Sequence, residues 1–265
     1  MSWSVYWAGY ADAWRAEWIK ARTVARTCWF LVGTIVLGIG LSVAVCAVVH
    51  YQVGGGQDPA ELALSGIQLA QALIAIWAVR AVSSEYRSGI IHTTLIAVPQ
   101  RVRVLIAKAS VSTALALATG TVITVSSLLI ARSVLMANGF TAAHGLPLAL
   151  TAGPTLRAAF GSVLYLGLIS LLATSTALVI RDSAAATGTV LGLLYLFPLA
   201  TQLAGNATWQ RHLQQIGPST AGLDIQATTN LSTLPIQPWA GISVLAAWAT
   251  ASLIAGGLAM HLRDS

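Results

Sequence analysis

The chain has 265 residues, of which 56% are hydrophobic and only 8% are charged. Because a water-soluble domain carries about 25% charged residues, this composition excludes an ordinary soluble protein and predicts a polytopic membrane protein; the mean hydropathy of +0.76 agrees. The formal net charge is +6, but the basic residues flank apolar runs and form no continuous patch. We therefore expect contacts with anionic lipid headgroups and no nucleic-acid partner.

The N-terminal segment 7–27 is predicted to form a helix that lies in the plane of the lipid headgroups. Its apolar face carries aromatic residues such as Trp14 and Trp18, and its opposite face carries cations such as Arg15 and Lys20. This distribution is typical of an interfacial helix, although a topological anchor without a functional contact fits the same pattern. The segment lacks the features of a cleavable signal, so the first span is expected to remain in the mature protein.

Six apolar runs follow, each near the length that a helix needs to cross about 30 Å of hydrocarbon. The second of these helices is expected to begin on Asp58, with Pro59 at its first position and Glu61 at its third. The runs predict an all-α fold with six transmembrane helices at residues 29–49, 63–82, 109–131, 160–180, 184–203 and 239–260.

The distribution of Lys and Arg predicts the orientation of the chain. An even number of spans puts both termini on one side, and basic residues near span ends are retained in the cytoplasm. With cytoplasmic termini, only Arg132, Arg157 and Arg211 lie outside. We expect Arg132 and Arg157 to meet lipid phosphates there.

Several spans contain small or hydroxyl residues at helical spacings. Gly188 and Gly192 in the fifth span, and Ser252 and Gly256 in the sixth, have a spacing that lets helices approach closely in lipid. Packing within one bundle is the favoured interpretation, and a subunit interface is the alternative. The third and fourth spans carry hydroxyls that we expect to bond the carbonyl one turn back, with a hydroxyl-lined substrate path as the alternative: Thr113, Thr124, Ser127, Ser170 and Thr174.

The polar and basic segment 83–108 between the second and third spans is expected to be a cytoplasmic loop. It starts with the polar run 85–89, continues with a mostly apolar run 90–98, and reaches Pro99, which ends any helix. This pattern is consistent with a short helix parallel to the membrane that rests on another protein. Composition alone would also fit a plain basic loop.

Three segments together resemble bacterial ABC-2 type transporter permeases. Residues 16–27, AEWIKARTVART, look like the family's segment before the first span, although Ala21 stands where Leu is usual. Residues 85–95, EYRSGIIHTTL, followed by the Val-Pro-Gln-Arg of 98–101 and the Ala-Lys-Ala of 107–109, are similar to its loop after the second span, with His92 where a basic residue is common. Residues 218–222, PSTAG, look like its Pro-Ser-x-Ala-Gly element.

The resemblance implies a role for each segment. The N-terminal helix would be the family's interfacial connecting helix, the loop 83–108 would carry the coupling helix seated on a cytoplasmic ATPase, and the loop 204–238 would be extracellular and fold back toward the bilayer. The residues that would carry these roles are Trp14, Arg15, Glu17, Trp18 and Lys20 in the interfacial helix; Glu85, Tyr86, Arg87, Gly89, Ile91, Thr94 and Leu95 in the ATPase-docking segment; and Pro218, Ala221 and Gly222 in the extracellular loop.

The family's usual assembly implies two permease subunits, identical or different, and two ATPase subunits in the plasma membrane of a bacterium. ATP and Mg²⁺ would bind to the ATPase, because this chain has no Gly-x-x-x-x-Gly-Lys-Ser/Thr loop, and no cofactor is expected here.

Catalytic and metal sites are not expected either. The five histidines lack the His-x-x-x-His spacing of a zinc helix, and no Gly-x-Ser-x-Gly nucleophile elbow occurs. The chain is therefore expected not to be an enzyme by itself. The resemblance implies that it is the permease of an ATP-driven exporter for a drug, peptide, lipid or similar amphiphile. The alternative is a six-span carrier that works without ATP, or a membrane scaffold.

Overall fold

A computed structural model describes residues 14–15, 17–19, 23, 25–52, 56–88, 101–141, 148–203 and 205–263, with backbone alone at 85–88, 101–105 and 260–263. The regular secondary structure of these residues is entirely helical, with no strand among them. Six helical stretches are long and apolar enough to cross a membrane, and each overlaps one predicted span: Ala25–Val48, Ile67–Ser84, Ile106–Ala137, Gly153–Ile180, Ser183–Gln202 and Pro238–Ala259. The all-α, multi-pass membrane character predicted from composition is confirmed.

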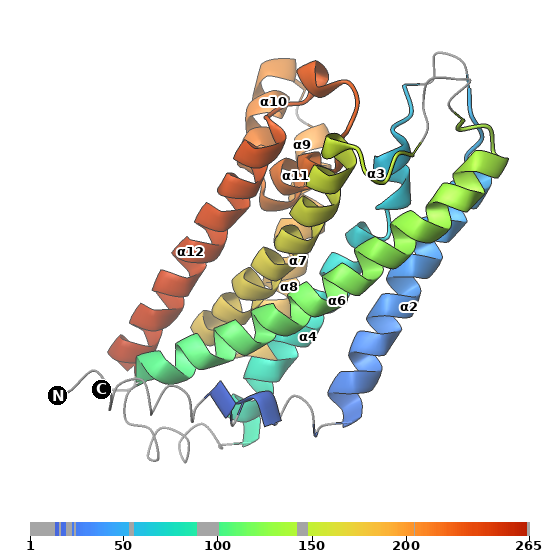
Figure 1. Ribbon diagram of the computed structural model, residues 1–265. Coiled ribbons are helices and arrows are strands. Elements are labelled where there is room, and N and C mark those ends of the chain that lie inside the picture. Colours follow the sequence, from blue (N-terminus) through green and yellow to red (C-terminus); the bar gives the residue numbers. More distant parts are fainter. Residues whose placement is uncertain are drawn as a thin grey trace.

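The spans form one bundle, and the short helices gather at one end of it (Figure 1). We call the end where α2 begins and α12 ends the proximal end, and the end that carries α3, α10 and α11 the distal end. The long helices are α2 (Ala25–Val48), α4 (Ile67–Ser88), α6 (Arg101–Ala137), α7 (Gly153–Ile180) and α12 (Pro238–Arg263), and the fifth span joins α8 (Ser183–Leu191), the π-helical turn η2 (Gly192–Leu196) and α9 (Phe197–Gln202).

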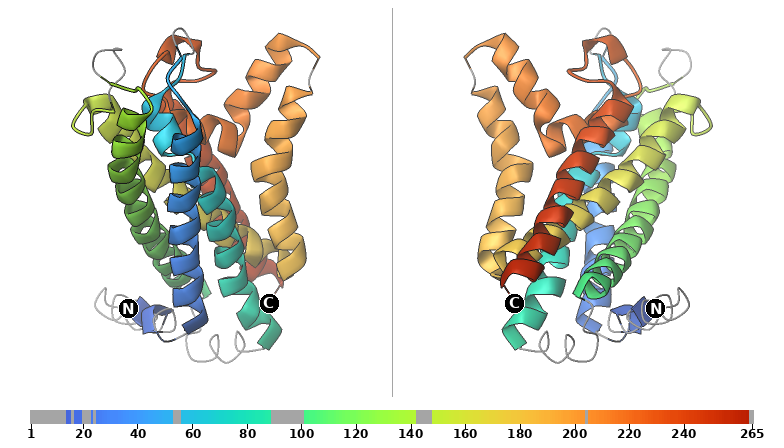
Figure 2. Two further views of the ribbon diagram at one scale, coloured as in Figure 1. Left: turned by 90° about the vertical axis from the view of Figure 1, so that its right-hand side faces the viewer. Right: turned by 90° about the vertical axis from the view of Figure 1, so that its left-hand side faces the viewer.

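Helix α7 is the centre of the bundle. It contacts α4, α6 and α12, and 61% of its most apolar window is buried, compared with 22% in each of the first, fifth and sixth spans. Small residues set the closest contacts in α6–α7, because Gly120 faces Leu166 and Gly167 faces Leu117. The first, fifth and sixth spans lie around this centre (Figure 2) and expose most of their apolar surface to lipid or to a partner.

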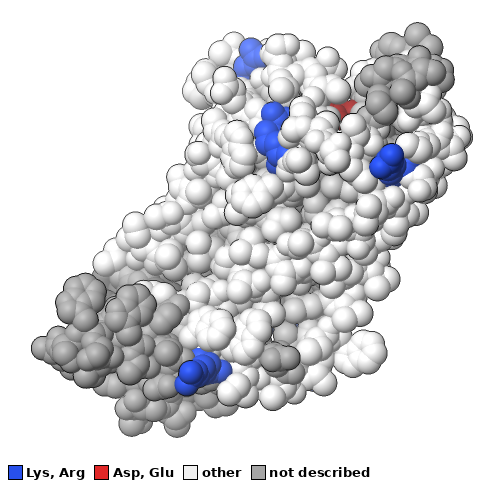
Figure 3. Space-filling view, in the orientation of Figure 1, with Lys and Arg blue, Asp and Glu red and all other residues white. Residues whose placement is uncertain are grey.

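The charged residues of the described chain lie toward the two ends of the bundle. On the face shown in Figure 3, the blue and red side chains sit near the ends, and an uncharged surface separates them. This distribution is the one that a bilayer requires, because charged side chains are costly in the hydrocarbon region.

Helix α6 is longer than the apolar run that predicted it. Its 37 residues extend about 55 Å at 1.5 Å per residue, well beyond the predicted span 109–131. The helix continues on both sides because no Pro or Gly interrupts its flanks. It stops just before Gly139, whose φ of +93° is a conformation that glycine adopts at low cost.

The second predicted helix is divided in two. Asp58 caps a five-residue helix, α3 (Pro59–Ala63), as the sequence predicted, but a turn at 64–66 separates it from α4. A close contact with α2 accompanies this turn: the Gly66 N–H donates to Ser42 Oγ at 2.9 Å, and a Cβ on Gly66 would lie 1.9 Å from the Gly38 carbonyl oxygen. The expected continuous helix was wrong because this tertiary contact favours the turn.

Candidate functional site

The proximal end carries the predicted ATPase-docking segment. Helix α4 continues as far as Ser88, beyond the predicted span 63–82, and α6 begins at Arg101, before the predicted span 109–131. Two helical extensions therefore flank the segment. Of the residues predicted to dock, Glu85, Tyr86 and Arg87 lie in the last turn of α4, described by backbone alone, whereas Gly89, Ile91, Thr94 and Leu95 lie outside the described residues.

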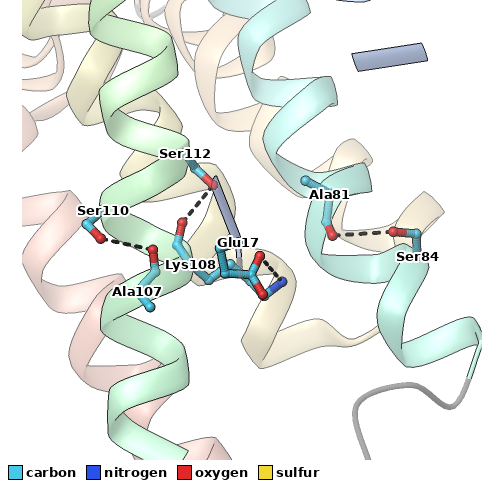
Figure 4. Close-up of polar contacts among 7 residues, drawn as sticks. All are labelled: Glu17, Ala81, Ser84, Ala107, Lys108, Ser110 and Ser112. Carbon is cyan, nitrogen blue, oxygen red and sulfur yellow. Dashed lines mark hydrogen bonds and ion pairs between the residues drawn. The ribbon is translucent and has the colours of Figure 1, made fainter. Parts of the chain in front are cut away.

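A buried ion pair joins the N-terminal segment to α6. Lys108 Nζ lies 3.3 Å from Glu17 Oε2, and the two side chains are 5% and 13% exposed. Figure 4 shows the Glu17 carboxylate at the Lys108 ammonium, beside the Ser112 hydroxyl that donates to the Lys108 carbonyl oxygen. An ion pair removed from water is costly to break, because the remaining charge stays buried. Glu17 is thus held against the proximal part of α6.

The predicted interfacial residues are partly described. The rings of Trp14 and Trp18 stack with centroids 5.4 Å apart, and Arg15 is exposed. Lys20 lies outside the described residues. The sequence pattern placed Trp14 and Trp18 on one face, but it carried no signal for the pairing of Glu17 with a residue in the third span.

At the distal end, the segment between the fifth and sixth spans packs into the bundle. It contains α10 (Ala207–Ile216), α11 (Pro218–Leu223), and the 3-10 turns η3 (Asp224–Gln226) and η4 (Leu231–Thr233). The predicted residues Pro218, Ala221 and Gly222 are all buried in α11. Figures 1 and 2 show α11 beside α7 and α12 at this end of the bundle.

Close backbone contacts hold α11 in place. A Cβ on Gly241 of α12 would lie 1.9 Å from the Ala221 carbonyl oxygen, and a Cβ on Gly222 would lie 2.6 Å from the Tyr165 ring of α7. The Ser219 hydroxyl donates to the Leu194 carbonyl oxygen at 2.8 Å. Because η2 is a π-helical turn at Leu194, its irregular backbone lies where α11 docks.

A buried carboxylate ties this segment to the start of α3. Asp58 is 7% exposed and accepts hydrogen bonds from the backbone N–H of Ala60 at 3.0 Å and of Glu61 at 3.4 Å, as an N-cap does. It also accepts from the N–H and hydroxyl groups of Thr228 and Thr229, including Thr228 Oγ1 at 2.7 Å and Thr229 N at 2.8 Å. One side chain thus joins two distal segments that are far apart in sequence.

Two further contacts strengthen the same junction. Arg157 of α7 donates to the Ala227 carbonyl oxygen, and Gln226 Nε2 donates to Ser162 Oγ at 3.2 Å. The expectation that Arg157 would meet lipid phosphates was wrong for its Nη2 atom, because the segment 205–238 supplies the Ala227 carbonyl oxygen as an acceptor. Arg132 is exposed, and its expected contact with lipid stays a prediction.

Two acidic groups near this junction have raised pKa values. Burial, and then the charge of Glu61, raise the pKa of Asp224 from 3.8 to about 7. Burial, and then the charge of Asp58, raise the pKa of Glu61. Asp224 Oδ2 has no hydrogen-bond partner within the described structure. Near neutral pH, Asp224 therefore exchanges its proton.

Polar contacts also occur inside the bundle. The Tyr165 hydroxyl of α7 donates to Gln71 Oε1 of α4, and the Tyr195 hydroxyl donates to the Gln68 carbonyl oxygen. Polar side chains within spans destabilise a membrane protein unless they have a partner. These two hydrogen bonds supply that partner and join α4 to α7 and to the fifth span.

The hydroxyls singled out in the sequence behave differently from the expectation. None of them bonds the carbonyl one turn back, and each is buried without a hydrogen-bond partner among the described atoms: Thr113, Thr124, Ser127, Ser170 and Thr174. Neighbouring residues such as Ser112 and Ser175 do bond that carbonyl. The local rule was therefore wrong for these five.

The two small-residue pairs have different surroundings. Gly256 of α12 faces α7, with a built Cβ 3.3 Å from the Ser175 carbonyl oxygen, whereas Gly188 of α8 has nothing within 4 Å. Packing within one bundle explains Gly256 and does not explain Gly188.

No protein-family model matches the chain, and no curated protein matches it. In the described part of the structure, no group of three or more His, Cys, Asp or Glu residues could hold a metal ion.

Proposed function

We propose that the chain is the membrane-spanning permease subunit of an ABC-2 type, ATP-driven exporter in a bacterial plasma membrane. The observation that carries the proposal is the coincidence of sequence and placement at the proximal end. The segment 83–108 resembles the family's coupling loop, and it connects two helices, α4 and α6, that extend beyond the apolar runs 63–82 and 109–131 into this polar and basic segment.

The proposed mechanism depends on the continuity of α4 and on the contacts of α3 and α6. Two copies of a separate ATPase bind ATP and Mg²⁺, close together, and press on the segment 83–108. Glu85 and Arg87, in the last turn of α4, supply charged contacts to the ATPase. Because α4 is continuous from Ile67 to Ser88, a displacement of its proximal end moves the distal turn at 64–66 as well.

The distal junction then couples that displacement to the segment 205–238. Helix α3 follows the turn, and its cap residue Asp58 holds Thr228 and Thr229. ATP binding shifts the permease between inward-open and outward-open states only if the ATPase has different affinities for the two. The Lys108–Glu17 ion pair keeps the N-terminal segment attached to α6 during this motion.

A second permease subunit completes the proposed assembly. The first and fifth spans are only 22% buried within this chain, and Gly188 on the fifth span has open space around it. An exposed small residue lets a partner helix approach closely in lipid. The cargo we propose is a drug, peptide, lipid or similar amphiphile that passes between the two subunits.

The test is to co-express the chain with a candidate ATPase and to exchange the charges with E85R/R87E. We expect loss of the complex and of permease-stimulated ATP hydrolysis, whereas R211E at the exposed distal end leaves both unchanged. Unchanged complex formation and unchanged stimulation in E85R/R87E would contradict the docking role. Transport by the purified chain without any ATPase would instead favour an independent carrier.

A further inference from the structure

A basic groove lies at the proximal end between α2, α4 and α8. It consists of two adjoining cavities of about 740 and 320 Å³ that share Arg26, Arg80 and Ser84. The larger cavity has a volume within the range of small-molecule clefts, roughly 300–1,000 Å³. Its wall on α8 is formed by Ser183, Ala184 and Thr187.

Within the described part of the structure, the two guanidinium groups of this groove have no counter-charge. Arg26 and Arg80 are both exposed, and neither has a hydrogen bond or ion pair to any part of the chain that the structure describes. Two like charges on one cavity repel each other, and a bound anion relieves that repulsion. A guanidinium group also matches a phosphate with two parallel hydrogen bonds.

Described acidic side chains do not fill this role. Glu17 is paired with Lys108, and Asp182, next to the groove, caps α8 by accepting from the Ala185 N–H at 2.7 Å. The hydroxyls of Ser183 and Thr187 add neutral donors on the wall opposite α2. Ser84 is already engaged, because its hydroxyl donates to the Ala81 carbonyl oxygen (Figure 4).

Apolar side chains line the groove one helical turn deeper than the polar ones. On α2, Phe30 follows Arg26 by four residues, and on α4, Ile76 precedes Arg80 by four. Residues four apart lie on the same face of a helix. Trp77 adds a large apolar surface beside them. The groove is thus cationic near the end of the bundle and apolar toward its middle, which is the polarity of a lipid.

We propose that this groove binds an anionic amphiphile, with a phosphate group between Arg26 and Arg80 and the acyl chains along Phe30, Ile76 and Trp77. This inference goes beyond the proposed exporter and does not depend on it, because it concerns binding by this chain alone. An anionic phospholipid and free inorganic phosphate share the phosphate chemistry, but only the phospholipid uses the apolar wall.

The test uses the full chain in neutral detergent and native mass spectrometry. The probes are dioleoylphosphatidylglycerol, dioleoylphosphatidylcholine and inorganic phosphate. We expect R26Q/R80Q to weaken phosphatidylglycerol binding by about thirtyfold, since each cation near an anionic headgroup contributes roughly a fivefold change in affinity. The control R211Q removes a charge from an exposed residue at the distal end and should leave phosphatidylglycerol binding within about twofold of the parent chain.

A second variant removes no charge. A184W fills the α8 side of the groove from an exposed position and should also weaken phosphatidylglycerol binding, which keeps the test valid if R26Q/R80Q fails to fold. Equal phosphatidylglycerol binding by the parent chain, R26Q/R80Q and A184W would overturn the proposal. Arginine-dependent binding of inorganic phosphate without preference for phosphatidylglycerol over phosphatidylcholine would overturn the assignment to an amphiphile.

Discussion

Replacing Asp58 with alanine should detach the folded-back segment 205–238 from the start of α3. The variant removes the cap of α3, which contributes about 1 kcal/mol. It also removes the acceptor of four hydrogen bonds from Thr228 and Thr229. Hydrogen bonds to charged groups contribute about 1.5–3 kcal/mol each and do not add fully, because Thr228 and Thr229 are only partly buried and water can replace the lost acceptor. We therefore expect D58A to lower the free energy of unfolding by about 3–5 kcal/mol.

The measurement is equilibrium unfolding in mixed micelles, followed by helix content. T228V serves as the matched control, because it removes one hydroxyl donor and keeps the hydrogen bonds from the backbone N–H groups of residues 228 and 229 to Asp58. This variant should lower the free energy of unfolding by about 1 kcal/mol. In the double variant D58A/T228V the two effects should be clearly less than additive. An unfolding free energy of D58A within about 1 kcal/mol of the parent chain, or additive effects in the double variant, would refute this account of the distal junction.

Three further predictions concern single contacts. G241A should lower the unfolding temperature, because the added Cβ would lie 1.9 Å from the Ala221 carbonyl oxygen. The control G33A adds a Cβ with nothing within 4 Å and should leave the unfolding temperature unchanged or slightly higher. Equal unfolding temperatures for the two variants would contradict the packing of α11 on α12. K108Q should lower the free energy of unfolding by about 3 kcal/mol, because it removes the buried cation that faces the Glu17 carboxylate. It should also make the N-terminal segment more accessible to limited proteolysis, and E17Q/K108Q should be less affected. A protease pattern of K108Q like that of R132Q would contradict the pairing. The pKa of Asp224 is raised from 3.8 to about 7 in the folded state, so the folded state keeps this proton to a higher pH than the unfolded state does. The free energy of unfolding should therefore fall as the pH rises from 4 to 7 and level off above pH 7. D224N should flatten this dependence, and a D224N unfolding temperature with the same pH profile as the parent chain would show that Asp224 does not cause it.

The sequence predicted the features that depend on local composition. The number and positions of the spans follow from hydropathy, because a bilayer accepts only long apolar helices. The cap of α3 by Asp58 was likewise readable from the Asp-Pro-x-Glu pattern. Gly256 was placed correctly in a close helix contact, although the same rule gave no way to recognise that a Cβ on Gly188 has nothing within 4 Å among the described residues.

Features that depend on distant partners could not be predicted. Lys108 and Glu17 are separated by 91 positions, and Asp58 and Thr228 by 170, so no local pattern brings them together. The break of the second helix arises from the contact of Gly66 with α2, which outweighs the helical preference of the surrounding residues. The groove of Arg26 and Arg80 combines three helices, and each cation alone resembles an ordinary residue at the end of a span.

The account depends most on the segment 83–108 facing the cytoplasm, where an ATPase can reach it. The direct measurement is labelling of S88C with a membrane-impermeant maleimide in a chain whose Cys28 and Cys46 are replaced by serine, with T208C on exposed α10 as the reference for the distal end. We predict that S88C is labelled in inverted membrane vesicles and not in intact cells, and that T208C shows the reverse. Labelling of S88C in intact cells would contradict the proposed coupling to a cytoplasmic ATPase.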